Sequence, residues 1–307
     1  MLFGFAYCTY NFFDKSFVDR SIFKNYTGPK LLHASHYYKS TKLVAENIRE
    51  TGVRHMVAEA DLKKSDYFNK HFDYIKQVYI LPHTLRPRYV NTTNFTARKN
   101  KCLALGTLVL ESKSDKSNAD YFAFFKTDTL HPMRKIIYQN KDKIADIIDS
   151  LISFHNKKRK AVSEKSAWYN KNFFFRYLYD LFFIAEGKDY HSFDIVEKYN
   201  QYKMFIAPEE NIGLSSINFV EGMACGCAYI GRSHNMYTDL EMIDKKHFIA
   251  YDGTLRDLRN KINYYQSHQK ELAEIAEKGY RFAQKRFSEK KVVSDFWQYL
   301  TKLTNNK

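Results

Sequence analysis

The sequence predicts an α/β protein with two Rossmann-like halves, in which helices cover parallel sheets on both faces. Short apolar runs alternate with amphipathic segments along most of the chain, which is the pattern of strands joined by helices. Hydrophobic residues make up 44% of the 307 residues, enough for a sizeable core. The chain has only 11 Gly and 5 Pro, so a loop-rich protein is excluded.

The first half is predicted to span residues 1–90. Strands are expected at 2–7, 30–34, 55–58 and 77–81, with a helix at 41–50. Two prolines then interrupt the pattern between residues 82 and 88, and polar residues follow to position 100. Because Pro breaks both helices and central strands, we expect the connection between the two halves here.

The second half is predicted to span residues 91–287. Strands are expected at 101–107, 121–125, 181–185, 203–207, 228–230 and 248–251. Helices are expected from Pro132, at 215–224, and in two terminal segments at 255–265 and 269–286. A last amphipathic helix within 288–307 carries Phe296, Trp297 and Leu300 on one face, which we expect to pack against another part of the chain.

Charge and cysteine content restrict the partners and the compartment. The formal net charge is +15, and residues 1–100 alone hold 16 basic and 8 acidic side chains, so an anionic partner is expected. The chain lacks an 18-residue apolar span and a basic leader, which argues against a membrane-spanning helix and a signal peptide. Four scattered cysteines favour a reduced, cytoplasmic environment.

Residues 202–226 carry the most informative pattern. A buried strand leads into an acidic loop with a glycine, and a helix follows. Ligands of open α/β sheets bind beyond the carboxyl ends of strands, and the free N–H groups of a helix start suit a phosphate. We therefore expect a phosphate-containing ligand near residues 214–216.

This stretch resembles the C-terminal half of GT-B glycosyltransferases, particularly the retaining family-4 (group 1) type. The resemblance rests on Glu-Asn-Ile-Gly-Leu at 210–214 and Glu-Gly-Met-Ala-Cys-Gly at 221–226. It implies that Glu210 contacts the donor sugar, that the amides of Gly213 and Leu214 hold sugar and diphosphate, and that Glu221 binds the ribose. Ten residues separate the two glutamates, more than the family's usual spacing, so Glu209 is an alternative to Glu210. Asn211, Ser215 and Ser216 complete the expected donor contacts.

The strand at 99–107 resembles the first strand of the GT-B donor domain. In that family a basic pair after this strand neutralises the departing diphosphate, and Arg134 and Lys135 in the helix opened by Pro132 match this role. The resemblance thus implies Glu210 and Arg134 as catalytic residues, with no metal or other cofactor. His33 and His36 lack a third ligand at metal-binding spacing.

The resemblance implies a GT-B-like fold with a reduced N-terminal half on the acceptor side, onto which the helix in 288–307 packs back. The expected activity is transfer of a sugar from a nucleotide diphosphate donor to a glycan or lipid-linked acceptor in surface polysaccharide assembly. The expected location is cytoplasmic, peripheral on the inner face of the membrane, where the basic run at 157–160 would meet anionic lipid.

Two alternatives stay open. The Tyr-Lys and Glu-Asn pairs at 202–203 and 210–211 are also similar to fucosyltransferase-like GT-B enzymes, which invert the anomeric centre. The short first half is also compatible with a non-catalytic GT-B-like subunit that binds a glycan or another transferase. A nucleic-acid partner is not expected, because no RNA- or DNA-binding module is recognisable.

Overall fold

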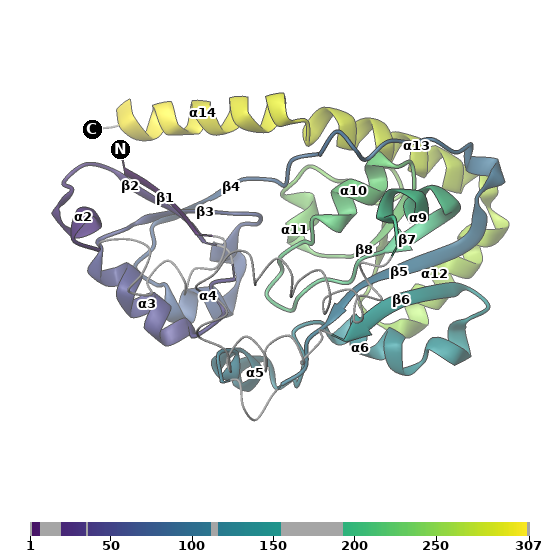
Figure 1. Cartoon of the computed structure of the whole chain (residues 1–307), viewed down its shortest axis with the longest axis horizontal. Coiled ribbons are helices and arrows are strands. Elements are labelled where there is room, and N and C mark those ends of the chain that lie inside the picture. Colours follow the sequence, from purple (N-terminus) through teal and green to yellow (C-terminus); the bar gives the residue numbers. More distant parts are fainter. Residues whose placement is uncertain (1, 7–19, 35, 112–115, 155–192, 306–307) are drawn as a thin grey trace, which may run out of the picture.

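The computed structural model describes residues 2–6, 20–34, 36–111, 116–154 and 193–305. They form two parallel sheets that lie side by side, and the strands of both sheets point their carboxyl ends toward the middle of the molecule (Figure 1). The predicted strand at 181–185 and the basic run at 157–160 lie outside the described residues.

The first sheet has four strands in sequential order, β1 (Leu2–Ala6), β2 (Lys30–Ala34), β3 (His55–Ala58) and β4 (Gln77–Ile80). The connecting elements are α2 (Arg20–Asn25), α3 (Thr41–Glu50), the short 3-10 helix η1 (Leu62–Lys64) and α4 (Asp66–His71). The apolar residues of α3 recur on one face and are buried against the sheet, as Val44 and Ile48 illustrate.

The second sheet has the order β6-β5-β7-β8-β9. Its strands are β5 (Lys99–Leu108), β6 (Ile148–Phe154), β7 (Tyr202–Ile206), β8 (Ala228–Arg232) and β9 (Ile249–Tyr251). The direction in which strands are added reverses between β5 and β7. In sheets of this kind, such a reversal opens a crevice at the carboxyl ends of the two strands, where ligands bind.

Helices cover both faces of the second sheet. One face carries α9 (Ile195–Gln201) and α10 (Asn218–Ala224), and the other carries α6 (Pro132–Gln139) and α12 (Leu255–Ser267). The long α13 (Gln269–Arg286) packs on α10 and β8. Smaller elements are η2 (Phe95–Ala97), η3 (Lys141–Ile144) and α11 (Asn235–Thr238).

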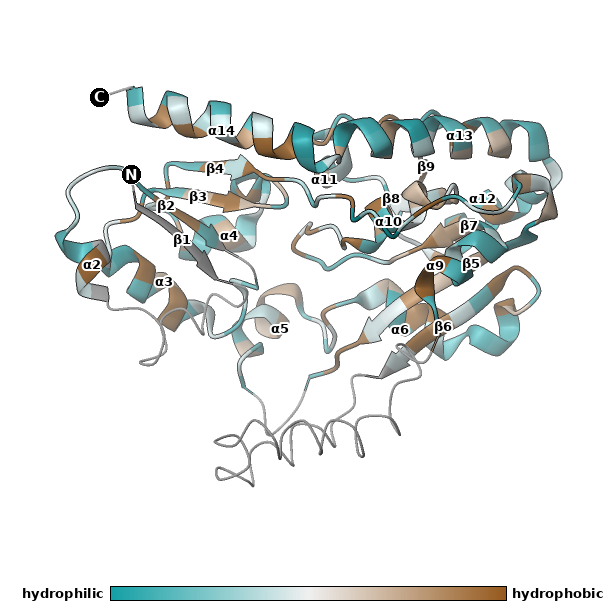
Figure 2. Cartoon of the chain, turned by 45° about the horizontal axis from the view of Figure 1, so that its top comes forward, coloured by the Kyte–Doolittle hydropathy of each residue, from teal (hydrophilic) through white to brown (hydrophobic). Residues whose placement is uncertain are grey.

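The last helix, α14 (Glu289–Asn305), leaves the second sheet and runs alongside the first (Figures 1 and 2). The ring of Tyr79 on β4 lies 5.7 Å from that of Phe296 and stacks on that of Tyr299 at 4.1 Å. The predicted common face is wrong for Trp297, which is 70% exposed, whereas Phe296 and Tyr299 contact Tyr79 on β4.

The predicted strand at 121–125 is also wrong, because these residues form the helix α5 (Ala119–Phe125). Aromatic residues favour strands, but a helix brings Tyr121, Phe122 and Phe125 onto the core of the first sheet. The Tyr121 ring lies 5.5 Å from Tyr38 and 5.9 Å from Tyr67, both of the first half. A segment of the second half thereby helps to build the core of the first.

The connection between the halves starts after β4. The Leu85 N–H donates to the Phe287 carbonyl at 2.7 Å, and Tyr89 is buried in the core of the second half. No helix of the described part of the chain is long and apolar enough to cross a bilayer.

Candidate functional site

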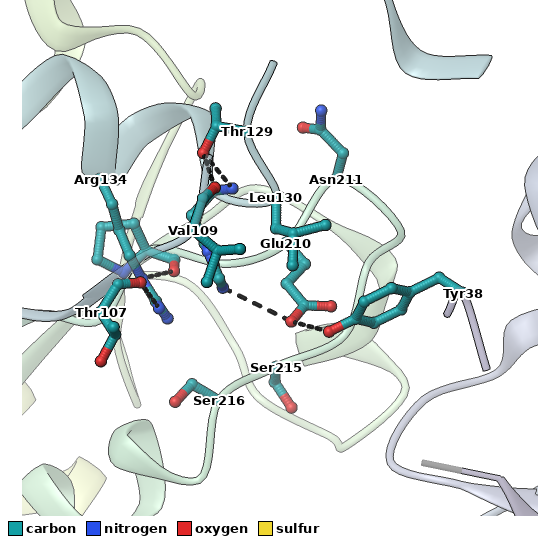
Figure 3. Close-up of polar contacts among 12 residues, drawn as sticks. Tyr38, Thr107, Val109, Thr129, Leu130, Arg134, Glu210, Asn211, Ser215 and Ser216 are labelled. Atoms are coloured by element: carbon teal, nitrogen blue, oxygen red, sulfur yellow. Dashed lines mark hydrogen bonds and ion pairs between the residues drawn. The ribbon is translucent and has the colours of Figure 1, made fainter. Parts of the chain in front are cut away.

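The candidate site lies between the two sheets, around the loop 207–216 that follows β7. Glu210 is the point at which the two halves meet: the Tyr38 hydroxyl, from the loop after β2, donates to Glu210 Oε1 at 2.9 Å (Figure 3). Backbone contacts join the same halves nearby, where the Ser40 N–H donates to the Ser117 carbonyl at 2.6 Å. The carboxylate is therefore held in the closed interface between the two sheets.

The second partner of Glu210 is His131, which immediately precedes α6. Its Nε2 lies 3.5 Å from Glu210 Oε1, whereas Glu210 Oε2 is buried and accepts no hydrogen bond from another described residue. A buried carboxylate oxygen without a donor is costly unless a ligand supplies one. Glu210 Oε2 is therefore a candidate acceptor for a ligand hydroxyl.

The pKa values of Glu210 and His131 shift in directions that fit a hydrogen bond between them. Burial disfavours the carboxylate, but the hydrogen bonds from His131 and Tyr38 outweigh it and lower the pKa of Glu210. Burial, together with the nearby Arg134 charge, lowers the pKa of His131 to about 4. At neutral pH a neutral imidazole thus donates to an ionised Glu210.

Glu209 faces the opposite way and is a structural residue. Its Oε1 accepts hydrogen bonds from the hydroxyls of Tyr229 and Tyr237 and from the backbone N–H of Arg232. These three donors tie the loop after β7 to β8 and α11. The alternative that Glu209 contacts the donor sugar finds no support in this arrangement.

Arg134 crosses the crevice between β5 and β7. Its Nε donates to the Pro208 carbonyl and its Nη1 to the Thr107 carbonyl, each at 2.9 Å (Figure 3). The guanidinium lies so close to Gly106, at φ 141°, that a Cβ there would be 2.5 Å from Arg134 Nε. Arg134 is buried and fixes the ends of both strands, while Lys135 forms a more exposed ion pair with Asp128.

The remaining loop residues, 213–216, lie just before the start of α10. Gly213 adopts φ 76° and packs against the His234 ring, and Leu214 contacts the cores of both halves. Ser215 is buried, and its Oγ bonds to no other described residue. Ser216 Oγ pairs with the Asn218 side chain at 2.7 Å, so the helix predicted from residue 215 begins at Asn218.

Glu221 lies one turn into α10 and is only 4% exposed. It is covered by the connection between the halves, where Tyr89 hydrogen-bonds to it and Arg86 and Arg88 lie close by. Burial raises the pKa of Glu221, and these partners only partly oppose the shift. Glu210 and Glu221 therefore lie in separate surroundings, one at the interface and one beneath the connection.

Sequence reasoning missed the side chains that hold Glu210, Tyr38 and His131. Neither belongs to a motif, and only the tertiary fold brings the loop after β2 to the start of α6. A second buried pair, His33 with Glu59 at 3.6 Å, also went unnoticed, because the two residues lie at the ends of adjacent strands. Among the described residues, no group of three potential ligands is arranged to hold a metal.

Comparisons with known proteins agree with this architecture. Residues 168–298 match a family model described as "Glycosyl transferase-like". The structure of sucrose-phosphate synthase from Thermosynechococcus elongatus superposes with a TM-score of 0.56 at 10% identity, covering 94% of this chain and 71% of that one. The fold is GT-B.

The Anabaena protein HepE has the same GT-B arrangement. Its structure described as a complex with UDP and glucose gives a TM-score of 0.52 at 10% identity, covering 89% of this chain and 71% of that one. The complex with UDP-glucose gives 0.52 at 11% identity, with 89% and 72% coverage. No curated protein sequence matches the chain. The family match and the GT-B fold together support a glycosyltransferase function.

Proposed function

We propose that this chain transfers a sugar from a nucleotide diphosphate donor to a glycan or lipid-linked acceptor in surface polysaccharide assembly. It would act in the cytoplasm, peripherally on the inner face of the membrane. The proposal rests on one observation above all: Glu210 has a buried carboxylate oxygen without a donor among the described residues, at the interface of a GT-B fold.

In the proposed reaction, Glu210 accepts a hydrogen bond from a hydroxyl of the donor sugar and thereby orients it. Its carboxylate is already ionised and held by Tyr38 and His131, so binding needs no proton transfer. The departing diphosphate would be stabilised electrostatically by Arg134 and Lys135 and by the amides of the loop 213–216. Glu221 would bind the ribose, with Tyr89 and the connection moving aside.

The proposed chemistry uses no metal, because basic side chains carry the diphosphate charge. The test is release of nucleoside diphosphate from a panel of sugar nucleotides that includes UDP-glucose, the ligand named in the HepE structure. We expect turnover of at least one donor, unchanged by a chelator and reduced in Glu210→Gln. Absence of turnover across the panel, with any glycan or lipid extract added, would reject the enzyme function.

We further propose a retaining outcome with a hexosyl donor, because the motifs at 210–214 and 221–226 are closest to retaining enzymes. The configuration of the product's anomeric centre, read by NMR, tests it. A product inverted relative to the donor would favour the fucosyltransferase-like mechanism instead.

A second candidate is a non-catalytic GT-B subunit that binds a glycan or another transferase. Two observations favour it: backbone carbonyls engage the Arg134 guanidinium, and the connection covers Glu221. The two candidates differ in nucleotide binding. Calorimetric titration with UDP should give heat for the enzyme and none for a subunit that has lost its donor site.

A further inference from the structure

A cavity of about 200 Å³ lies between the two halves, on the other side of the loop that carries Glu210. Asn211 marks this separation, because its side chain points away from the Glu210 carboxylate (Figure 3). The first half contributes the residues from the end of β3 through η1 to α4, and the second contributes α5, the loop after β7 and the start of α11. Its lining includes the polar residues Asp66, Asn211 and Asn235 and the aromatic residues Tyr67, Phe124 and Phe125.

The polar side chains of this cavity include several that the fold does not use. The carboxylate of Asp66 and the side-chain amides of Asn211 and Asn235 form no hydrogen bond or ion pair with another described residue. Each can therefore exchange its hydrogen bonds with water for bonds to a ligand. A carboxylate accepts hydrogen bonds and a side-chain amide both accepts and donates them, so together they match the paired donors and acceptors of vicinal hydroxyl groups.

Aromatic rings form another part of the lining. Phe124 and Phe125 are half-buried, and both contact the buried Tyr67, at ring distances of 5.2 and 5.6 Å. Rigid aromatic surface next to unused polar groups suits a ligand with an apolar C–H face and a rim of hydroxyls. A pyranose ring has this character.

The charge of the lining disfavours the nucleotide donor in this cavity. The lining holds three carboxylates, Asp61, Asp66 and Asp239, against the single ammonium of Lys64. In a chain of net charge +15 this local negative surface would repel a diphosphate. The volume leaves room for at least one sugar ring.

We propose that this cavity binds one sugar ring of the acceptor, and that the acceptor is therefore a saccharide. The acceptor role rests on the proposed transferase function, whereas saccharide binding rests on the cavity alone. The Lys64–Asp239 ion pair, at 2.5 Å, joins the two halves at this place, so an occupied cavity requires the closed arrangement.

The test uses methyl glycosides of glucose, galactose, mannose and N-acetylglucosamine with the full chain, read by saturation-transfer NMR. At least one glycoside should bind with a millimolar Kd. Asp66→Asn and Asn235→Ala should each weaken it about tenfold, as expected for loss of one hydrogen bond to a charged or amide group. Asp146→Asn, an exposed change remote from the lining, is the matched control and should bind like the natural chain.

UDP titration of the same samples separates the two claims. UDP binding without glycoside binding, or glycoside binding that both variants preserve, would overturn the cavity assignment and leave the donor site standing. Binding of putrescine but of no glycoside would identify a cation site and overturn it as well. Glycoside binding without binding of UDP, GDP, CDP or dTDP would overturn the transferase function and, with it, the acceptor role.

Discussion

Two adjacent carboxylates, Glu209 and Glu210, have opposite tasks at the residue scale. The Glu209 oxygen that faces Tyr229 and Tyr237 already accepts three hydrogen bonds, which fix the loop to β8 and α11. Glu210 instead keeps one buried oxygen without a donor from the described residues. Because successive residues of an extended loop point in opposite directions, one can anchor the loop while the other serves a ligand.

Because Glu209 anchors the loop and Glu210 is free to serve a ligand, replacing each by Gln should have different effects. Glu210→Gln should lower kcat/KM by about ten- to hundredfold, because a charge-assisted hydrogen bond to the donor sugar is lost, and should lower the melting temperature less than Glu209→Gln does, because the amide oxygen can still accept from Tyr38. Glu209→Gln should instead reduce the free energy of unfolding by about 1–3 kcal/mol, because an amide cannot satisfy three donors as a carboxylate does. Melting curves and donor turnover of both variants provide the check. The reverse pattern would exchange their roles.

Glu221 permits a prediction with a defined pH dependence. Its pKa is raised on folding, so the folded chain binds this proton more tightly than the unfolded chain. The free energy of unfolding therefore decreases as the pH rises from the unfolded pKa, near 4.3, through the folded one. Glu221→Gln removes this loss, so it should be more stable than the natural chain at pH 7.

If Glu221 also binds the ribose, Glu221→Gln should weaken UDP binding by about ten- to hundredfold. Chemical denaturation at several pH values and calorimetric titration give the two quantities. Glu46→Gln, an exposed change on α3, is the control and should alter neither. Unchanged UDP affinity in Glu221→Gln would remove Glu221 from the donor site.

At the scale of the elements, the turn between β7 and α10 depends on Gly213. Its φ of 76° is unfavourable for other residues, and an added Cβ would lie 2.6 Å from the Cε1 atom of His234. Gly213→Ala should therefore destabilise the chain by more than the roughly 1–2 kcal/mol of left-handed strain alone. It should also weaken UDP binding, because the following amides shift.

Gly52 offers a matched control for this change. It has a similar φ of 70°, but a Cβ there would meet only the flexible end of Lys30, at 3.3 Å. Gly52→Ala should show the backbone strain without the contact with His234 and without an effect on UDP. Equal losses of stability in both variants would mean that His234 does not confine Gly213.

How far the sequence could predict these elements depends on where their determinants lie. The structure confirms several predicted elements, because each shows its hydrophobic period or its capping residues in its own local sequence. They include the strands at 30–34, 55–58 and 228–230 and the helices from 132, 255 and 269. Helix α5 was predicted as a strand, because what decides it is the first sheet's core, far away in sequence. For the same reason, the contacts of Tyr38 and His131 with Glu210 could not be predicted, whereas the acidic loop shows its strand, loop and helix pattern in the local sequence.

At the scale of the molecule, contacts of different kinds hold the two halves together. The Lys64–Asp239 ion pair and the Tyr38–Glu210 hydrogen bond join the facing loops, while α5 supplies aromatic rings to the first core. On the outside, α14 stacks Tyr299 on Tyr79. The first two of these contacts involve charged side chains of the proposed donor site and of the cavity, so we expect ligand binding at both places to depend on this arrangement of the two halves.

The positive charge of the whole chain bears on membrane binding. Because the net charge is +15, we propose that the chain binds membranes peripherally and by charge. Vesicles with phosphatidylserine should retain the chain at low salt and release it as salt rises, because charges are screened over about 10 Å at 0.1 M. Vesicles of phosphatidylcholine alone are the control and should not retain it.

A variant of the exposed Trp297 on α14 distinguishes electrostatic binding from insertion. If charge alone is responsible, Trp297→Ser should bind phosphatidylserine vesicles as the natural chain does, because the substitution alters no charge. If α14 instead inserts an apolar side chain, the same variant should bind more weakly, since a Trp loses burial in the interface. Binding that resists salt and is weakened by Trp297→Ser would therefore contradict the electrostatic proposal and assign the contact to α14.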